Sequence, residues 1–186
     1  MGYLEKNGLL SLFLNEYPEA SNFIHTKLYR STVDQFHQNA FSYISSPESK
    51  LRTYSIFKTE IGMEKYLCEM KNCDIRVKYT KFRLSNHNLM IEKGRHMGMK
   101  SAERMCPFCM DKVEDELHFL LDCHVYNQIR GLLLREVGVR SYFFKYFRRE
   151  HKFKYLMTNF SSEVADVIYK CFELRDFLLS SPKRCE

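Results

Sequence analysis

Four side chains of the types that bind metals lie close together near the middle of the chain, with the spacing Cys106-x2-Cys109-x8-His118-x4-Cys123. Two cysteines separated by two residues can place both sulfurs on one ion, because a tight turn between them points neighbouring backbone N–H groups inward. Pro107 suits such a turn, since its ring fixes φ near −65°. Three thiolates and one imidazole make a closed tetrahedral shell, the structural kind of zinc site, with no open position for an activated water. The pattern therefore predicts that these four residues bind Zn²⁺.

The local sequence around the four residues raises three further expectations. An uninterrupted helix would turn His118 and Cys123 apart, so we expect the helix that carries His118 to break near Asp122. The acidic run 114–116 offers candidates to accept the second ring proton of His118. His124 is an alternative fourth ligand, and a chance pairing of the two cysteines in CPFC is the competing interpretation.

Cysteine usage and the start of the chain indicate a cellular compartment. Seven cysteines is an odd number, and no signal-like apolar stretch follows the start. We therefore expect an intracellular protein, in the cytoplasm or the nucleus, whose thiols are reduced. In that compartment, clustered cysteines indicate a metal site in preference to a disulfide. No run approaches the roughly 18 apolar residues of a membrane span, so we expect no membrane partner.

Apolar periodicity predicts a mainly α fold, a helical domain organised around the small CCHC zinc-binding motif. Glycine and proline are scarce, at seven and four, which argues against a chain of hairpins. Apolar residues recur at steps of three and four, and they predict helices over 19–44, 51–61, 64–72, 74–85, 114–121, 126–137 and 161–180.

Two helix ends, one loop and three segments complete the structural expectation. Asp74 is expected to cap the helix over 74–85, and Gly138 to end the helix over 126–137. Residues 86–105 read as an irregular approach to the cysteines. The segments would then be a helical segment over 1–79, a zinc-binding module over 80–137 and a C-terminal helical segment over 138–186.

The net charge of +6 is unevenly distributed. Residues 50–104 carry 13 Lys and Arg against 6 Asp and Glu, and residues 140–160 carry 6 against 1. Between them, residues 105–139 carry 3 against 6. Basic blocks favour an anionic partner such as nucleic acid, although solvated helix faces have the same composition.

The central motifs carry a family resemblance. The stretches TKFRLSNHNLMIEKGRH at 80–96, ERMCPFC at 103–109 and EDELHFLLDC at 114–123 resemble the C-terminal zinc-binding region of reverse transcriptases from animal non-LTR (LINE-type) retrotransposons. The flanks are also similar, so the resemblance covers most of the chain. The residues that match the family pattern are Arg83, His87, Glu92, Gly94, Arg95, Glu103, Arg104, Cys106, Cys109, Glu116, His118 and Cys123.

The resemblance implies a parent protein with an endonuclease, a polymerase and this tail, whose expected role is to grip template RNA or target DNA. The chain itself has no Tyr/Phe-x-Asp-Asp pair for catalytic magnesium and no endonuclease carboxylate set. We therefore expect no enzymatic activity and no small-molecule substrate. The expected partners are RNA or DNA and the rest of the reverse transcriptase polypeptide.

Candidate phosphate contacts fall in the two basic blocks, and they are Arg76, Lys78, Lys81, Arg83, Lys93, Arg95, Lys100, Arg148, Arg149, Lys152 and Lys154. Aromatic rings beside the second block are available to stack on unpaired bases, with core packing as the competing interpretation. These rings are Tyr142, Phe144, Tyr146 and Phe147.

Two other classes of function are compatible with the sequence. A non-catalytic zinc scaffold would pack against the polymerase or another protein without touching nucleic acid. An enzyme could, for instance, use Cys68 or Cys73 as nucleophile beside a histidine, but nothing nearby supplies a base or an oxyanion hole at recognisable spacing.

Overall fold

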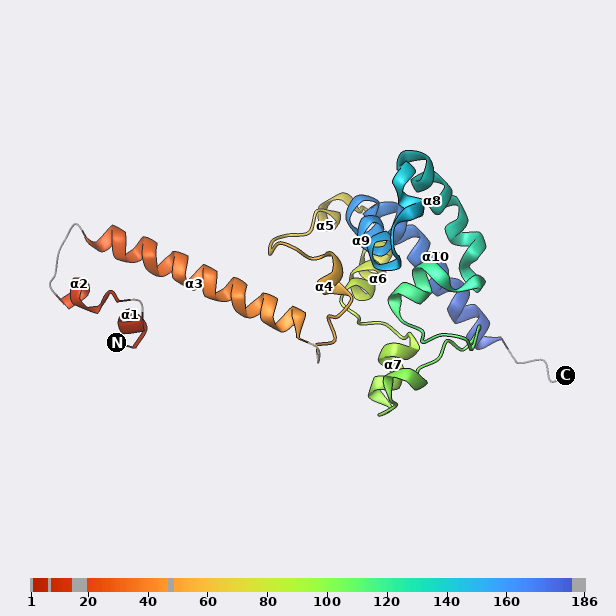
Figure 1. Ribbon diagram of the computed structural model, residues 1–186, viewed down its shortest axis with the longest axis horizontal. Coiled ribbons are helices and arrows are strands. Elements are labelled where there is room, and N and C mark those ends of the chain that lie inside the picture. Colours follow the sequence, from red (N-terminus) through yellow and green to blue (C-terminus); the bar gives the residue numbers. More distant parts are fainter. Residues whose placement is uncertain (1, 7, 15–19, 47–48, 182–186) are drawn as a thin grey trace. The chain divides into compact units, whose positions relative to one another are not determined.

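The chain folds mainly into helices. The computed structural model describes the whole sequence (Figure 1) except residues 1, 7, 15–19, 47–48 and 182–186. Across the described residues, β pairing is limited to one isolated antiparallel bridge between Met105 and Val113. The chain divides into two compact units, one ending at Ser49 and one beginning at Lys50.

The first unit consists of α1 (Gly2–Lys6), α2 (Leu10–Leu14) and α3 (Ala20–Ser45). The long helix predicted over 19–44 is confirmed by α3. None of the side chains of α3 that the structure describes is buried. Of all the helices described, none has both the length and the apolar content that crossing a membrane requires.

The second unit holds the remaining elements. They are α4 (Tyr54–Phe57), α5 (Tyr66–Glu69), α6 (Cys73–Arg83), α7 (Met90–His96), η1 (Ser101–Glu103), η2 (His118–Asp122), η3 (His124–Tyr126), α8 (Asn127–Arg140), η4 (Tyr142–Tyr146), α9 (Arg149–Asn159) and α10 (Ser161–Ser180). The helix predicted over 161–180 is confirmed. The expected segment boundaries near 79 and 137 both lie inside this unit, across which α10 packs against α6, α8 and α9.

Several local predictions were wrong. The helix expected over 51–61 shrinks to the four residues of α4. The side chain that caps α6 is Asn72, whose Oδ1 accepts the backbone N–H groups of Asp74 and Ile75 at 3.0 and 3.2 Å. Helix α8 continues through Gly138, because glycine permits a helix end without enforcing one.

The stretch 86–105 is more regular than expected, since it contains α7 and η1. The Arg104 guanidinium donates to the carbonyl oxygen of Met99 at 2.8 and 3.1 Å and to that of Ile91 at 2.9 Å. A Cβ on Gly94 would lie 2.6 Å from Cγ of Arg104. The side chain of Arg104 therefore occupies the space beside Gly94 and ties α7 to the segment that leads into the cysteines.

Phenylalanine rings from four elements form the centre of the core. Phe82 of α6, Phe119 of η2, Phe153 of α9 and Phe172 of α10 are all buried. The ring centroids of Phe119 and Phe172 lie 4.6 Å apart, and those of Phe82 and Phe119 lie 5.8 Å apart. Because each buried ring removes a large apolar area from water, the turn that carries His118 is anchored by its neighbour Phe119.

A buried ion pair joins α10 to the start of that turn. Arg175 donates from Nε and Nη2 to the two carboxylate oxygens of Glu114 at 3.0 and 2.8 Å, and both side chains are almost fully buried. The backbone N–H of Met90 also donates to Glu114, at 2.7 Å. The paired geometry offsets the cost of removing both charges from water.

We expect Glu114→Gln to lower the free energy of unfolding by about 3–5 kcal/mol, because it leaves the Arg175 charge buried without a carboxylate. The double variant Glu114→Gln/Arg175→Met should recover most of that loss, since neither charge of this pair then remains. Urea unfolding followed by circular dichroism, at fixed zinc concentration, measures both. Equal losses in the single and double variants would contradict this account of the pair.

Candidate metal centre

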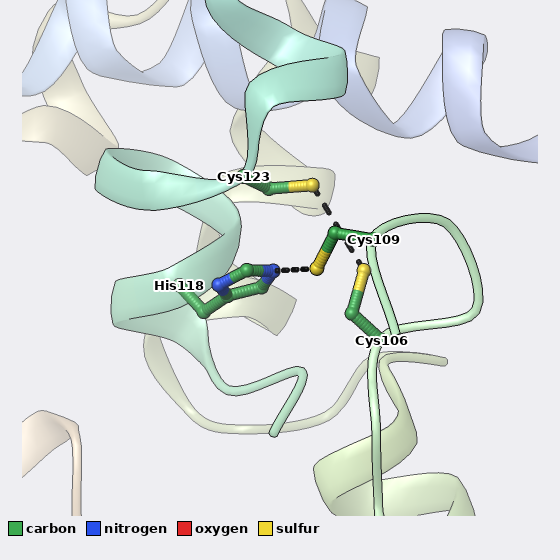
Figure 2. A group of neighbouring side chains, drawn as sticks. All are labelled: Cys106, Cys109, His118 and Cys123. Atoms are coloured by element: carbon green, nitrogen blue, oxygen red, sulfur yellow. Dashed lines mark hydrogen bonds between the residues drawn. The ribbon is translucent and has the colours of Figure 1, made fainter. Parts of the chain in front are cut away.

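The structure brings Cys106, Cys109, His118 and Cys123 together, and Figure 2 shows their side chains converging from two segments. One ligand atom from each residue lies within 4.8 Å of the other three. The sulfurs of Cys106 and Cys123 are 3.9 Å apart, and the Cys109 sulfur lies 3.3 Å from Nε2 of His118.

These separations match the distances expected between atoms that bind the same metal ion. A tetrahedral ion with metal–sulfur bonds of about 2.3 Å separates its sulfurs by about 3.8 Å. A disulfide would require a sulfur–sulfur distance of about 2.05 Å. The four residues could therefore hold one metal ion, whereas the alternative ligand His124 is exposed and lies outside the cluster.

A tight hairpin carries Cys106 and Cys109. The bridge between Met105 and Val113 closes its base, and the backbone N–H of Met110 donates to the carbonyl oxygen of Cys106 at 3.0 Å. Backbone N–H groups of the turn donate to both cysteine sulfurs, as the Cys-x2-Cys spacing predicts. Such N–H groups favour the thiolate, which is the form that binds a metal.

A π-helical turn begins at His118, and Cys123 directly follows its last residue. In an α-helix, five steps of about 100° would leave these residues roughly 140° apart around the axis. Here the backbone N–H of Cys123 instead donates to the carbonyl oxygen of His118 at 2.8 Å, which is the i to i+5 bond of a π turn. The helix ends at Asp122, as predicted, and the π turn returns Cys123 to the side of His118.

The acidic run before His118 does not have the predicted role. The ring Nδ1 of His118 is buried and has no hydrogen-bond partner in the described part of the chain. Glu114 is bound to Arg175, and Asp115 accepts the backbone N–H of His118 at 2.6 Å, where it caps the start of the helical turn. The prediction that one of these acids accepts the second ring proton was wrong, because each side chain has another partner.

The third acid, Glu116, is the centre of a buried polar network. Its carboxylate accepts the hydroxyl groups of Thr53 and Ser85 at 2.9 and 2.8 Å, and it lies 2.9 Å from Nε2 of His87. Arg52 donates to both of its oxygens at 3.0 Å. Burial raises the pKa of Glu116, but His87 and Arg52 outweigh that effect and lower it to about 2. Glu116 is therefore ionised at neutral pH, and it joins α4 and the segment after α6 to the metal centre.

Burial and backbone hydrogen bonds set the ionisation of the four candidate ligands. Burial raises the pKa of Cys106 to about 12 and also raises the pKa of Cys123. Burial acts the same way on Cys109, but backbone N–H groups outweigh it and lower that pKa. Burial lowers the pKa of His118, so its imidazole is neutral at neutral pH with a lone pair to donate. Binding of a divalent ion would then displace thiol protons, which is the usual coupling at such sites.

A buried arginine lies beside this centre. Arg130 is 5% exposed, makes no ion pair with any described residue, and leaves its Nη1 without a hydrogen-bond partner there; Nη2 donates to Asn127. Burial lowers the pKa of Arg130, and the negative charge of the Cys123 thiolate acts against that shift. A divalent ion held by three thiolates and a neutral imidazole carries a net charge of −1, which a neighbouring guanidinium would balance.

The candidate phosphate contacts have different surroundings. Arg83 is 3% exposed, lies 4.3 Å from the centroid of the Phe57 ring and pairs with Glu64 at 2.7 Å. Arg83 is therefore a core residue, and its charge does not reach the surface.

Five of the other candidates have partners within the chain. Arg76 donates to the carbonyl oxygen of Met70, and Lys152 is half-buried over the ring of Phe144. The remaining three form ion pairs, and these are Lys78 with Asp176, Arg95 with Glu92, and Arg149 with Asp115 and Asp122. Five candidates are exposed and make no ion pair within the described residues, and they are Lys81, Lys93, Lys100, Arg148 and Lys154.

The candidate stacking rings also divide. Phe144 is buried and Phe147 is half-buried, which fits core packing, whereas Tyr142 and Tyr146 are exposed. Phe143, which sequence reasoning missed, is exposed beside them. The signal in the sequence was its position, since Phe143 stands directly between the candidate rings Tyr142 and Phe144.

Comparison of the chain with models of protein families, with characterised proteins and with solved structures gives no match. The geometry of the cluster and the chemistry of its ligands therefore carry the functional argument.

We expect Arg130→Met to weaken metal binding about tenfold or more, because it removes the charge that balances the thiolates. The metal-free protein should be as stable as the wild type or more so, since an unpaired buried charge is lost. Competition with a chromophoric chelator measures the affinity, and urea unfolding of both forms measures the stability. A variant that binds metal as tightly as the wild type would show that Arg130 has no such role.

Proposed function

We propose that this chain is a zinc-stabilised nucleic-acid-binding module, similar to the C-terminal region of LINE-type reverse transcriptases, which grips template RNA or target DNA and has no polymerase active site of its own. Its expected setting is intracellular, in the cytoplasm or the nucleus, and its expected partners are nucleic acid and the rest of a reverse transcriptase. The convergence of three thiols and one imidazole within 4.8 Å is the observation that carries the proposal.

The ligand chemistry supports zinc as the ion. Thiolate and imidazole are the ligands of structural zinc sites, whereas magnesium and calcium prefer oxygen. In this role Cys106, Cys109, His118 and Cys123 hold the ion, and zinc supplies a cross-link between the hairpin and the π turn. In small zinc peptides such binding is worth on the order of 10–16 kcal/mol near neutral pH. That is comparable with the stability of a whole domain.

Unpaired surface charge supports nucleic acid as the partner. Lys81, Lys93 and Lys100 come from the segment that precedes the hairpin, and Arg148 and Lys154 come from the region of α9. Cations without acidic partners are free to replace the counterions of a phosphate backbone. By contrast, the arginines Arg83 and Arg95 and the acid Glu116, which match the family pattern, form ion pairs within the chain.

A non-catalytic scaffold is the second candidate, and one observation favours it. The long helix α3 exposes large aromatic rings, and all of its described side chains are at least partly accessible to solvent. These rings are Phe23, Tyr29, Phe36 and Tyr43. Rings of this kind are typical of a protein contact surface, which a scaffold within a larger polypeptide would use.

We expect the purified wild type to contain one zinc ion per chain by elemental analysis. Cys109→Ser should lose the zinc and the helical signal of the surrounding residues, because three ligands no longer complete the shell. The matched control is Cys68→Ser, since Cys68 is exposed and lies outside the cluster. Full zinc loading in Cys109→Ser would show that the ligand assignment is wrong.

We expect binding to nucleic acid to weaken steeply with added salt. Each phosphate contact contributes roughly 0.7 to 0.9 log units per log unit of salt, so Arg148→Gln/Lys154→Gln should reduce the slope by about two such contributions. Arg140→Gln is the matched control, because Arg140 is paired with Glu136 and Glu163. Fluorescence anisotropy with labelled RNA and DNA measures the slope. If the wild type binds neither at low salt, the scaffold is the better account.

A further inference from the structure

The turn η4 sends its aromatic rings in opposite directions. Phe144 points into the core, where its ring centroid lies 5.8 Å from that of Tyr155. The other three rings face solvent, with Tyr142 65%, Phe143 68% and Tyr146 66% exposed. One buried ring thus anchors a short turn that exposes three others.

The exposed rings form a cluster with a lysine. The ring centroids of Tyr142 and Tyr146 lie 6.0 Å apart, and those of Tyr142 and Phe143 lie 5.7 Å apart. Nζ of Lys145 lies 4.2 Å from the Tyr142 centroid and 4.9 Å from the Tyr146 centroid. The flexible stem of lysine keeps this positive charge next to both rings and allows it to move when a ligand covers them.

The surrounding charge selects the class of partner. Residues 140–160 carry six Lys and Arg and one acidic residue. Arg148, just beyond the turn, is exposed and makes no ion pair with a described residue. Protein interfaces are enriched in aromatic residues but depleted in lysine. A ring cluster with lysine at its centre and an arginine at its edge instead suits a strand that presents both base faces and phosphates.

We propose that Tyr142, Phe143, Lys145 and Tyr146 form a stacking platform for the unpaired bases of single-stranded nucleic acid. The inference rests on the proposed function and makes it more specific, because the bases of a duplex are stacked on one another and do not offer their faces to a protein. The rings provide stacking surfaces, while Lys145 and Arg148 contact phosphates of the same strand.

The test uses the zinc-loaded full chain with a labelled single strand of about 20 nucleotides and a duplex of the same sequence. The platform variant is Tyr142→Ala/Phe143→Ala/Tyr146→Ala, which alters exposed side chains only. Phe177→Ala is the matched control, because Phe177 on α10 is 65% exposed. Tyr142→Phe/Tyr146→Phe retains the aromatic faces. Zinc content and circular dichroism report whether each variant is folded.

We expect the platform variant to bind the single strand about tenfold or more weakly, since base–aromatic stacking is worth roughly a factor of ten per ring. Its salt slope should match the wild type, because the phosphate contacts remain. Duplex affinity, the Phe177→Ala variant and the double Tyr→Phe variant should be unchanged.

Three results would overturn the platform. Unchanged single-strand affinity in the triple variant would reject it while leaving the proposed function in place. An equal loss for the single strand and the duplex would show that the rings do not read unpaired bases. A wild type that self-associates through these rings, with a monomeric triple variant, would assign them to a protein contact. A wild type that binds neither nucleic acid would instead reject the proposed function itself.

Discussion

Three consecutive carboxylates, residues 114–116, hold the segment that leads into the imidazole ligand from three directions. Glu114 is bound to Arg175 of α10, and Asp115 caps the turn that begins beside it. Glu116 is surrounded by groups from the residues just before α4 and from the segment after α6. Glu114 and Glu116 are buried, and a buried carboxylate is stable only with matched partners, so each of these two acids ties the segment to a different element. The position of His118 follows from all three.

The candidate metal centre is thus built with two levels of constraint. The hairpin and the π turn place four ligands around one point, and the ion pairs and phenylalanine rings around them hold those two segments in the core. Zinc at this point would cross-link the two segments directly, in addition to these contacts. On the outside of the same unit, the cations without acidic partners and the exposed rings of η4 remain available to a ligand.

The sequence predicted the structures that depend on local periodicity. It did not predict the roles of residues whose partners lie far away in the chain. Helices α3 and α10 were predicted closely because apolar steps of three and four persist over many turns. The short α4 was overestimated, since nothing local shows that its neighbours serve the network around Glu116. The cluster of four candidate ligands was readable from spacing alone. The roles of the acids were not, because Arg52 lies 64 residues before Glu116 and Arg175 lies 61 residues after Glu114. The π turn was equally hidden, although the five-residue spacing required some departure from an α-helix.

The long-range ion pairs also limit how this protein can be divided. A peptide cut to the 80–137 boundaries would keep all four candidate ligands but lose both Arg52 and Arg175. Glu114 and Glu116 would then lack their counter-charges, and the apolar faces of η2 would lose Phe153 and Phe172 as neighbours. Such a minimal finger could chelate an ion without adopting the shape described here. A piece that keeps both ion pairs and the whole of α10 extends from the residues just before Arg52 to Ser180.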